Sequence, residues 1–146
     1  MKPSLSLFDT VAATDHLGFW ANETLNAKGV ADFLSLGKKD VAKVAGVALS
    51  SVRFDQKIPR EVLERMEEIA NICLLVAQYF SGDVSKTALW FKTKNPLLGG
   101  ITPRDMIRFG RYSRLQKFVL EALEQNSAAS TPEETVNAKT TAGAAS

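Results

Sequence analysis

The stretch from Pro59 to Phe80 constrains the fold of this chain more than any other. In its first half, apolar residues recur at the spacing of one helix face, as at Val62, Met66 and Ile69. In its second half, apolar residues occur almost all the way around the helix. Because such a helix must be covered on several sides, the pattern predicts a long central helix.

We expect the second half of this helix to lie between helices of its own chain and a second copy of the protein. Its apolar surface exceeds what one small domain can cover, and large exposed apolar patches usually mark interfaces. The candidate residues for this homodimer contact are Ile72, Leu75 and Tyr79. The alternative is that the same residues pack inside one chain, beneath Trp90.

Short helices are predicted on both sides of the central helix, marked by Gly, Pro and capping residues. No segment alternates with the period of a strand, so the predicted fold class is all-α. Gly37, Gly46 and Gly110 are expected to end helices, and Asp83 to begin one. The predicted short helices are 27–35, 38–45, 50–57 and 84–92, then one of two turns from Pro103 and a last amphipathic helix through Leu115, Phe118, Val119, Ala122 and Leu123.

Four segments differ in composition. Residues 1–26 are of mixed polarity, and Phe8, Phe19 and Trp20 suggest that part of this segment docks on the body. Residues 27–58 and 59–124 carry the two motifs described below. Residues 125–146 are rich in Ala, Ser and Thr, which offer too little apolar surface to offset the entropy of ordering. We therefore expect a flexible polar tail there.

The net charge of +2 hides an uneven distribution. Residues 27–58 sum to +3, residues 59–85 to −3, and residues 86–117 to +7. Two basic blocks separated by an acidic one suit an acidic partner such as nucleic acid.

The sequence shows no recognisable pattern of catalytic side chains. Cys73 lies in an apolar run and reads as a core residue, and His16 has no second ligand type nearby. There is no nucleophile–base pair, metal cluster or phosphate loop, so we expect neither enzyme activity nor a cofactor. No run approaches ~18 apolar residues, and the N-terminus makes a poor signal peptide. A soluble, cytoplasmic protein without a membrane span is the prediction.

The run KKDVAKVAGVALSSVRFDQKI, residues 38–58, has the features of a helix-turn-helix. Ala42 is small where a second helix would cross, Gly46 tolerates a left-handed turn, and Val47 and Val52 would pin the two helices together. The second helix could then enter a DNA major groove. The alternative is a plain helical hairpin whose glycine only closes a turn.

In the DNA-binding interpretation, the second helix presents its first residues to base edges. Arg can bind guanine and Gln can bind adenine with two hydrogen bonds each. The candidates are Ser50, Ser51, Arg53 and Gln56 at the bases, with Lys43 and Lys57 near phosphates. The run resembles the helix-turn-helix of the Xre (phage-repressor-like) regulators.

A second motif, NPLLGGITPRDMI, covers residues 95–107. Asn95-Pro96 should stop the preceding helix, and Gly99-Gly100 permit backbone angles and a close approach that a side chain would forbid. Thr102 and Pro103 suit the cap and first position of a new helix, with Asp105 as the acid of a capping box. By these features alone, the loop is rigid and tightly packed, and a purely structural corner is one interpretation.

The longer pattern ALWFKTKNPLLGGITPRDMI, followed by Gly110 and a final helix, closely resembles the toxin-binding domain of Xre–MbcA–ParS-type antitoxins. The resemblance covers about residues 27–124, since the helix-turn-helix lies upstream as in that family. Arg104 stands where the family usually has a Leu-like residue. The residues that carry the resemblance are Trp90, Asn95, Pro96, Leu98, Gly99, Gly100, Thr102, Pro103, Gly110, Val119 and Leu123.

This resemblance implies an Xre-like helix-turn-helix followed by a small helical toxin-binding domain, joined by the long helix. It implies an antitoxin that covers the active-site cleft of a NAD-consuming RES-domain toxin encoded by the neighbouring gene. It also implies repression of the operon through operator DNA. The rival hypothesis is a free-standing transcription regulator whose C-terminal domain only dimerises.

Three arginines, Arg104, Arg108 and Arg111, share one helical side or its immediate continuation. Three interpretations are open for them: simple solvent exposure, contact with an acidic toxin surface, or contact with DNA phosphate. We include them, with Trp90 and the loop, among the candidate toxin-binding residues.

Overall fold

The computed structural model describes residues 12, 14–55 and 57–129, and this part of the chain is mostly helical. The prediction of a helical protein is confirmed, with one small antiparallel hairpin added near the N-terminus. The elements are β1 (Trp20–Ala21), β2 (Thr24–Leu25), α2 (Ala27–Phe33), α3 (Lys38–Ala45), the 3₁₀ turn η1 (Leu49–Ser51), α4 (Arg60–Tyr79), α5 (Val84–Phe91), the 3₁₀ turn η2 (Pro96–Leu98), α6 (Pro103–Arg108) and α7 (Tyr112–Ala129).

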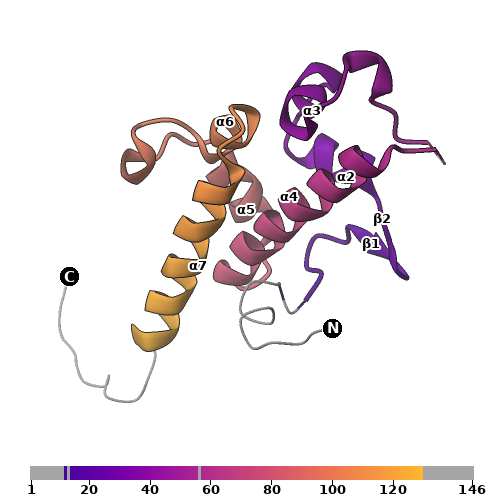
Figure 1. Cartoon of the computed structure of the whole chain (residues 1–146). Coiled ribbons are helices and arrows are strands. Elements are labelled where there is room, and N and C mark those ends of the chain that lie inside the picture. The colour runs from indigo at the N-terminus through magenta and orange to yellow at the C-terminus, as the bar shows by residue number, and fades with distance from the viewer. Residues whose placement is uncertain (1–11, 13, 56, 130–146) are drawn as a thin grey trace.

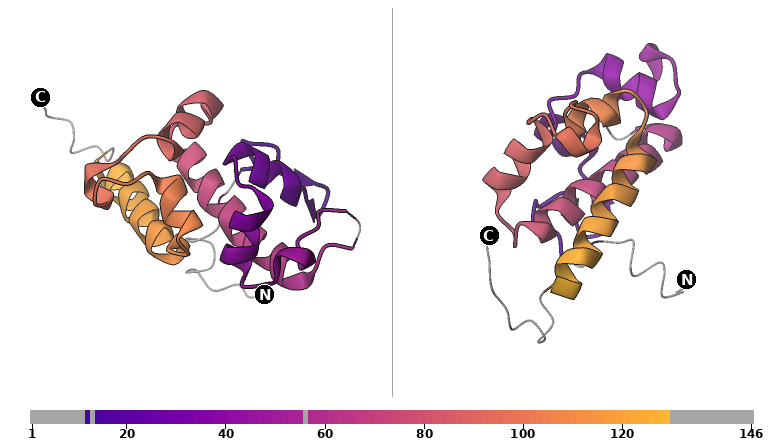
Figure 2. Two further views of the ribbon diagram at one scale, coloured as in Figure 1. Left: turned by 90° about the horizontal axis from the view of Figure 1, so that it is seen from above. Right: turned by 90° about the vertical axis from the view of Figure 1, so that its left-hand side faces the viewer.

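Helix α4 is the central element, as its apolar pattern predicts. It packs against α2 and α3 and also against α5 and α7 (Figures 1 and 2). Val62, Met66 and Ile69 in its first half are fully buried, and so are Cys73 and Leu75 in its second half. Most of the second half is therefore covered by helices of a single chain, whereas Tyr79 at its end is exposed.

Capping side chains begin several helices where the sequence predicts them. The carboxylate of Asp83 accepts a hydrogen bond from the backbone N–H of Lys86 at the start of α5. Gly46 ends α3 in a left-handed conformation, with φ of 72°. The end of α2 differs from the prediction: Leu34 is its C-cap and Ser35 takes the left-handed conformation, with φ of 54°. Gly37 instead is extended and begins α3.

The predicted helix over residues 50–57 is wrong. Only the single turn η1 forms, and the described residues from Val52 to Ile58 are irregular. Val52 is buried and Phe54 and Ile58 are partly buried, whereas Arg53, Asp55 and Lys57 are exposed. This alternation of apolar and polar residues is typical of extended backbone, and an eight-residue helix is too short to form without tertiary support.

One cluster of buried residues runs through the described part of the chain, from Phe19 to Val119. A series of aromatic rings crosses the expected boundary after residue 58. The ring centroid of Phe33 in α2 lies 5.8 Å from that of Phe19 and 6.3 Å from that of Phe91 in α5. The segments 27–58 and 59–124 therefore share one core. Phe19 docks on the body as predicted, whereas Trp20 is exposed.

At the C-terminal end, α7 continues to Ala129. The prediction of a flexible tail from residue 125 is therefore wrong for residues 125–129, and the remainder, 130–146, lies outside the described residues, as does Phe8. None of the described helices is both long and apolar enough to cross a membrane.

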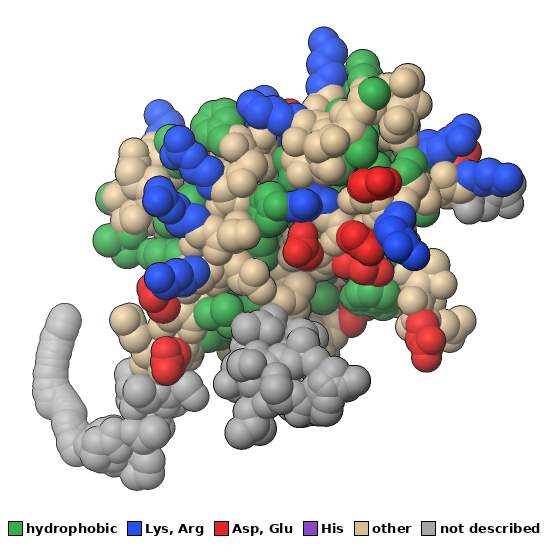
Figure 3. All heavy atoms as spheres, viewed as in Figure 1, with side chains coloured by type: hydrophobic (Ala, Val, Ile, Leu, Met, Phe, Trp, Pro, Cys, Tyr) green, Lys and Arg blue, Asp and Glu red, His purple; other side chains and the backbone are tan. Residues whose placement is uncertain are grey.

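Charged side chains are unevenly spread over the face shown in Figure 3. Lys and Arg side chains gather over the region of α3, α6, η2 and the first half of α7, whereas acidic side chains lie over the region of α4 in the centre and right of the view and near the lower end of α7. This agrees with the positive sum of residues 86–117 in the sequence.

Candidate functional site

A groove of about 500 Å³ lies between α4, α5, η2 and α7. Its apolar surface comes from four elements that are far apart in the sequence. Val76 and Tyr79 project from α4 and Phe80 from its C-cap, Trp90 from α5, Leu97 from η2, and Phe118, Val119 and Ala122 from α7. Polar groups of Asn95, Glu121, Gln125 and Asn126 complete the lining.

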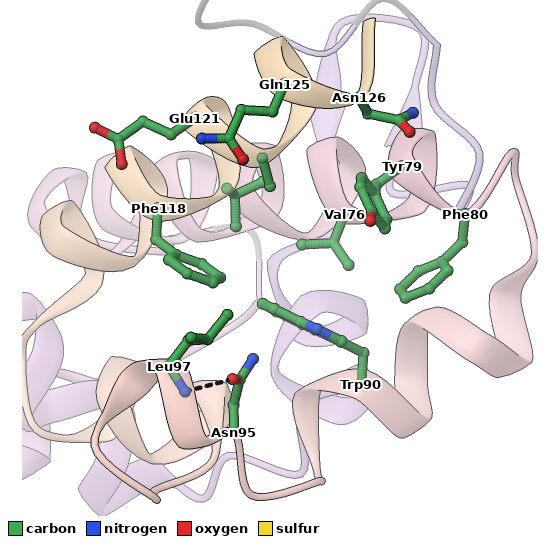
Figure 4. A pocket seen from close by; sticks show the side chains of 12 residues that line it. Val76, Tyr79, Phe80, Trp90, Asn95, Leu97, Phe118, Glu121, Gln125 and Asn126 are labelled. Carbon is green, nitrogen blue, oxygen red and sulfur yellow. Dashed lines mark hydrogen bonds between the residues drawn. The ribbon is translucent and has the colours of Figure 1, made fainter. Parts of the chain in front are cut away.

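Trp90 is a central side chain of this groove. Its indole ring extends from α5 into the cavity, where Val76 and Phe118 point toward it from the other helices (Figure 4). The ring is held edge-to-face against Phe91, with 5.1 Å between centroids, and Phe91 is itself fully buried. The core therefore fixes the direction in which Trp90 points, so this wall of the groove is preorganised.

The loop from Asn95 to Ile101 closes on itself. The backbone N–H of Asn95 donates to the carbonyl of Ile101 at 3.0 Å, and the carbonyl of Asn95 accepts from Leu98 and Gly100. The side-chain oxygen of Asn95 also accepts from the N–H of Leu97 at 2.9 Å. All four hydrogen bonds involve Asn95 and close the loop, which agrees with the expectation of a rigid turn.

The tip of this loop presents Leu97, whose residue surface is 78% exposed. Figure 4 shows its side chain pointing toward Phe118 across the groove. The sequence prediction named Leu98, which is partly buried and packs on the core. It also missed Val76, Phe80 and Phe118, because periodicity places these residues on apolar faces without showing which of them a neighbouring helix leaves uncovered.

Gly99 and Gly100 both have φ of 82°, so the expected left-handed conformation is confirmed. The expected close approach is wrong: a Cβ built on either glycine would meet nothing within 4 Å. Gly99, Gly100 and Pro96 are exposed. The glycines thus serve the turn itself rather than tight packing.

After the loop, Thr102 caps α6 by accepting a hydrogen bond from the N–H of Asp105, and Pro103 is buried in its first turn. Asp105 does not complete a capping box. Its carboxylate instead binds Arg108 at 2.9 Å. Pro103 is buried and therefore does not form part of an exposed binding surface.

Arg104 and Arg108 join α6 to α2 and α3. The guanidinium of Arg104 donates to the carbonyls of Leu34 and Ser35, which lack helical partners at the end of α2. Arg108 donates to the carboxylate of Asp40 in α3 at 3.0 Å. Both arginines are thus engaged within the chain, and solvent exposure alone does not describe them. Arg111 is exposed.

The Asp40–Arg108 pair affects the titration of both groups. Partial burial by itself raises the pKa of Asp40, but hydrogen bonds from Arg108 and from the Gly37 N–H, together with the charges of Arg108 and Arg104, bring it below its ordinary value. Hydrogen bonds to Asp40 and Asp105 raise the pKa of Arg108 in turn. The pair is therefore ionised throughout the neutral range.

The candidate DNA-binding residues do not form a recognition helix. Lys43 is exposed on α3, and Ser50 and Ser51 lie in the turn η1. Arg53 is exposed and pairs with Asp55 at 3.7 Å, while Lys57 is exposed in the irregular segment. Gln56 lies outside the described residues.

Of the candidate dimer residues, Ile72 and Leu75 are buried within the single chain, and only Tyr79 of the three is exposed, at 43%. The expectation that a single chain cannot cover Ile72 and Leu75 is wrong, because α2, α3, α5 and α7 all pack around α4. Tyr79 lies instead at the groove.

In comparisons with known proteins, no family model, no curated protein and no solved structure matches the chain.

Proposed function

We propose that this protein is an antitoxin that binds a NAD-consuming RES-type toxin through the groove around Trp90 and Leu97. The observation that carries the proposal is that the segment resembling a toxin-binding domain builds one wall of this groove. Trp90, Asn95 and Leu97 all line it.

The chemistry of the groove suits an apolar segment of a protein partner. Aromatic and aliphatic side chains make most of its surface, and asparagine, glutamine and glutamate side chains lie at its polar rim. Interfaces commonly combine a buried apolar centre with such a polar rim. Because the loop carrying Leu97 is held by its own hydrogen bonds, little conformational entropy would be lost on binding.

Inhibition by this route requires no chemistry from the antitoxin. The bound protein would cover the toxin's NAD cleft and so exclude its substrate. In the same proposal the chain represses its own operon by binding operator DNA, although the irregular segment after η1 does not support base reading by Ser50, Ser51 or Arg53.

A pair of exposed leucines provides a matched test. Leu97→Glu puts a charge into the groove, whereas Leu89→Glu puts the same charge on α5 at a residue that is 67% exposed and does not line the groove. Each variant is co-expressed with the product of the neighbouring gene, and growth rescue and co-purification are measured. We expect Leu97→Glu to lose both and Leu89→Glu to keep both.

Two results would contradict the proposal. If Leu97→Glu rescues growth and co-purifies as well as the unaltered protein, the groove does not bind the toxin. If the neighbour's product is neither toxic nor bound by the unaltered protein, the antitoxin function itself is wrong. The second result favours the rival function, a free-standing transcription regulator.

A further inference from the structure

A row of exposed cationic side chains lies on both sides of one exposed aromatic ring. We call this surface the basic ridge and define it by Lys39 and Lys43 on α3, Phe109 and Arg111 at the corner between α6 and α7, and Arg114 and Lys117 on α7. All six residues are exposed. None of them lines the groove.

Phe109 is the apolar centre of the ridge. It is the C-cap of α6, directly before Gly110 turns the chain with φ of 82°, and it is 48% exposed. The ammonium group of Lys43 lies 5.7 Å from the ring centroid. Contact with a cation helps to hold the ring in place, while about half of the residue's surface stays accessible.

The cations of the ridge are available to a ligand. Within the described part of the chain, none of its five Lys and Arg residues forms an ion pair. The neighbouring carboxylates of Asp40 and Asp105 are already bound by Arg108. The positive charge of the ridge is therefore not neutralised by the adjoining acidic residues.

The spacing of these cations follows the helices that carry them. Lys39 and Lys43 are four residues apart and therefore share one side of α3. Helix α3 itself packs against α6. Arg111 directly before α7, and Arg114 and Lys117 within it, recur every three residues. One basic row thus reaches the Phe109 ring at Lys43, and the other begins at Arg111, two residues after Phe109 in the chain. Lys and Arg side chains gather over the region of α3, α6 and the start of α7 in Figure 3.

We propose that the basic ridge binds single-stranded nucleic acid, with backbone phosphates against the five cations and one unpaired base stacked on Phe109. Positively charged surfaces with exposed aromatic rings bind single strands in this way, without reading sequence. A duplex is the less suitable ligand, because its bases are stacked inside and the residues described directly after η1, 52–55 and 57–59, form no helix that could enter a groove. The ridge is separate from the groove, so this inference does not depend on the proposed antitoxin function.

The number of cations predicts the salt dependence. If five phosphates are neutralised, the logarithm of the association constant should fall with the logarithm of salt concentration with a slope of about −3.5. Affinity would then drop about 100-fold between about 50 and about 200 mM salt. Loss of a stacked base should weaken binding about 5- to 150-fold.

The experiment measures fluorescence anisotropy of a labelled, mixed-sequence single strand titrated with the full chain. The double variant Arg111→Glu/Arg114→Glu should make the salt dependence shallower, with the magnitude of the slope falling from about 3.5 to about 2 or below. Arg53→Glu/Lys57→Glu reverses two exposed charges outside the ridge and should leave the slope near that of the unaltered protein. Phe109→Ala should weaken binding, and Phe109→Trp should restore it, with far-UV circular dichroism checking that each variant is folded.

Three outcomes would overturn the proposal. A duplex of the same length that binds as tightly as the single strand would remove the role of the unpaired base. Polyglutamate that competes as well as nucleic acid would make the ridge a surface for acidic proteins. A loss of binding in Arg53→Glu/Lys57→Glu but not in Arg111→Glu/Arg114→Glu would show that the nucleic acid binds the segment after η1 and not the basic ridge. None of these outcomes bears on rescue from the toxin, which the Leu97→Glu comparison measures.

Discussion

Replacing Phe33 and Phe91 by leucine, singly and together, tests whether the two halves of this chain unfold as one unit. Phe33 lies in α2, before the expected boundary at residue 58, and Phe91 lies in α5, after it. Their rings meet edge-to-face at 6.3 Å with an interplanar angle of 78°. A free-energy coupling between them therefore measures contact across that boundary.

The contacts of each ring set the expected magnitudes. Phe33 also contacts Phe19 and Phe91 also contacts Trp90, so each phenylalanine takes part in two ring pairs. A ring pair contributes about 0.5–1.5 kcal/mol beyond the area it buries, and leucine keeps most of that area. Each single variant should lower the free energy of unfolding by about 1–3 kcal/mol, and the shared pair should appear as a coupling of about 0.5–1.5 kcal/mol.

Urea unfolding followed by circular dichroism and by tryptophan fluorescence provides the measurement. We expect one transition with the same midpoint by both probes, since a single cluster of buried residues joins the two halves. Phe109→Leu is the control, because Phe109 is 48% exposed, and its effect should stay within about 0.5 kcal/mol. Two separate transitions, or a coupling near zero, would refute the conclusion that the segments share one core.

Three further predictions concern single groups. Because the pKa of Asp40 is lower in the folded than in the unfolded chain, its carboxylate stabilises the fold above the unfolded pKa of about 4, and this stability is lost as the pH falls through the folded pKa. The melting temperature of Asp40→Asn should therefore decrease less on acidification than that of the unaltered protein. Burial raises the pKa of the Cys73 thiol, so a thiol reagent should modify Cys73 only as fast as the chain unfolds, and rapid labelling of the native protein would contradict its burial. Gly100 has φ of 82° with open space around it, so Gly100→Ala should lower the free energy of unfolding in urea by about 1–2 kcal/mol, Gly100→Asn by less and Gly100→Val by more. Equal losses for all three variants would contradict backbone strain as the cause.

Local signals in the sequence predicted most helix boundaries correctly. Asp83, Thr102 and Gly46 act through hydrogen bonds or backbone angles that depend on nearby residues alone, so their roles can be read from the chain. The apolar spacing of 59–80 also predicts a central helix, and α4 occupies that place. The helix predicted over residues 50–57 does not form, because the short run with Val52, Phe54 and Ile58 has signals for both helix and extended backbone. The packing of these side chains decides between the two conformations.

The candidate site was only partly predictable. The loop motif identified Asn95 and its rigid turn, because proline and glycine restrict or extend the allowed backbone angles locally. Which leucine the loop exposes depends on how η2 sits against α7, and Leu97 rather than Leu98 faces Phe118. Likewise, the spacing of Arg104 and Arg108 placed them on one side of a helix but contained no information on the carbonyls and carboxylate that they bind, some 68–70 residues earlier.

The helical class, the central helix, the caps and the turn of the loop could be predicted from the sequence alone, because each depends on interactions between residues close together in the chain. The tertiary structure decided three other features: the single core on both sides of residue 58, the burial of Ile72 and Leu75, and the groove around Trp90. Those features depend on which helix faces meet. Several amphipathic helices in one small protein can pair in more than one way, and only the packing of all of them together selects the pairing.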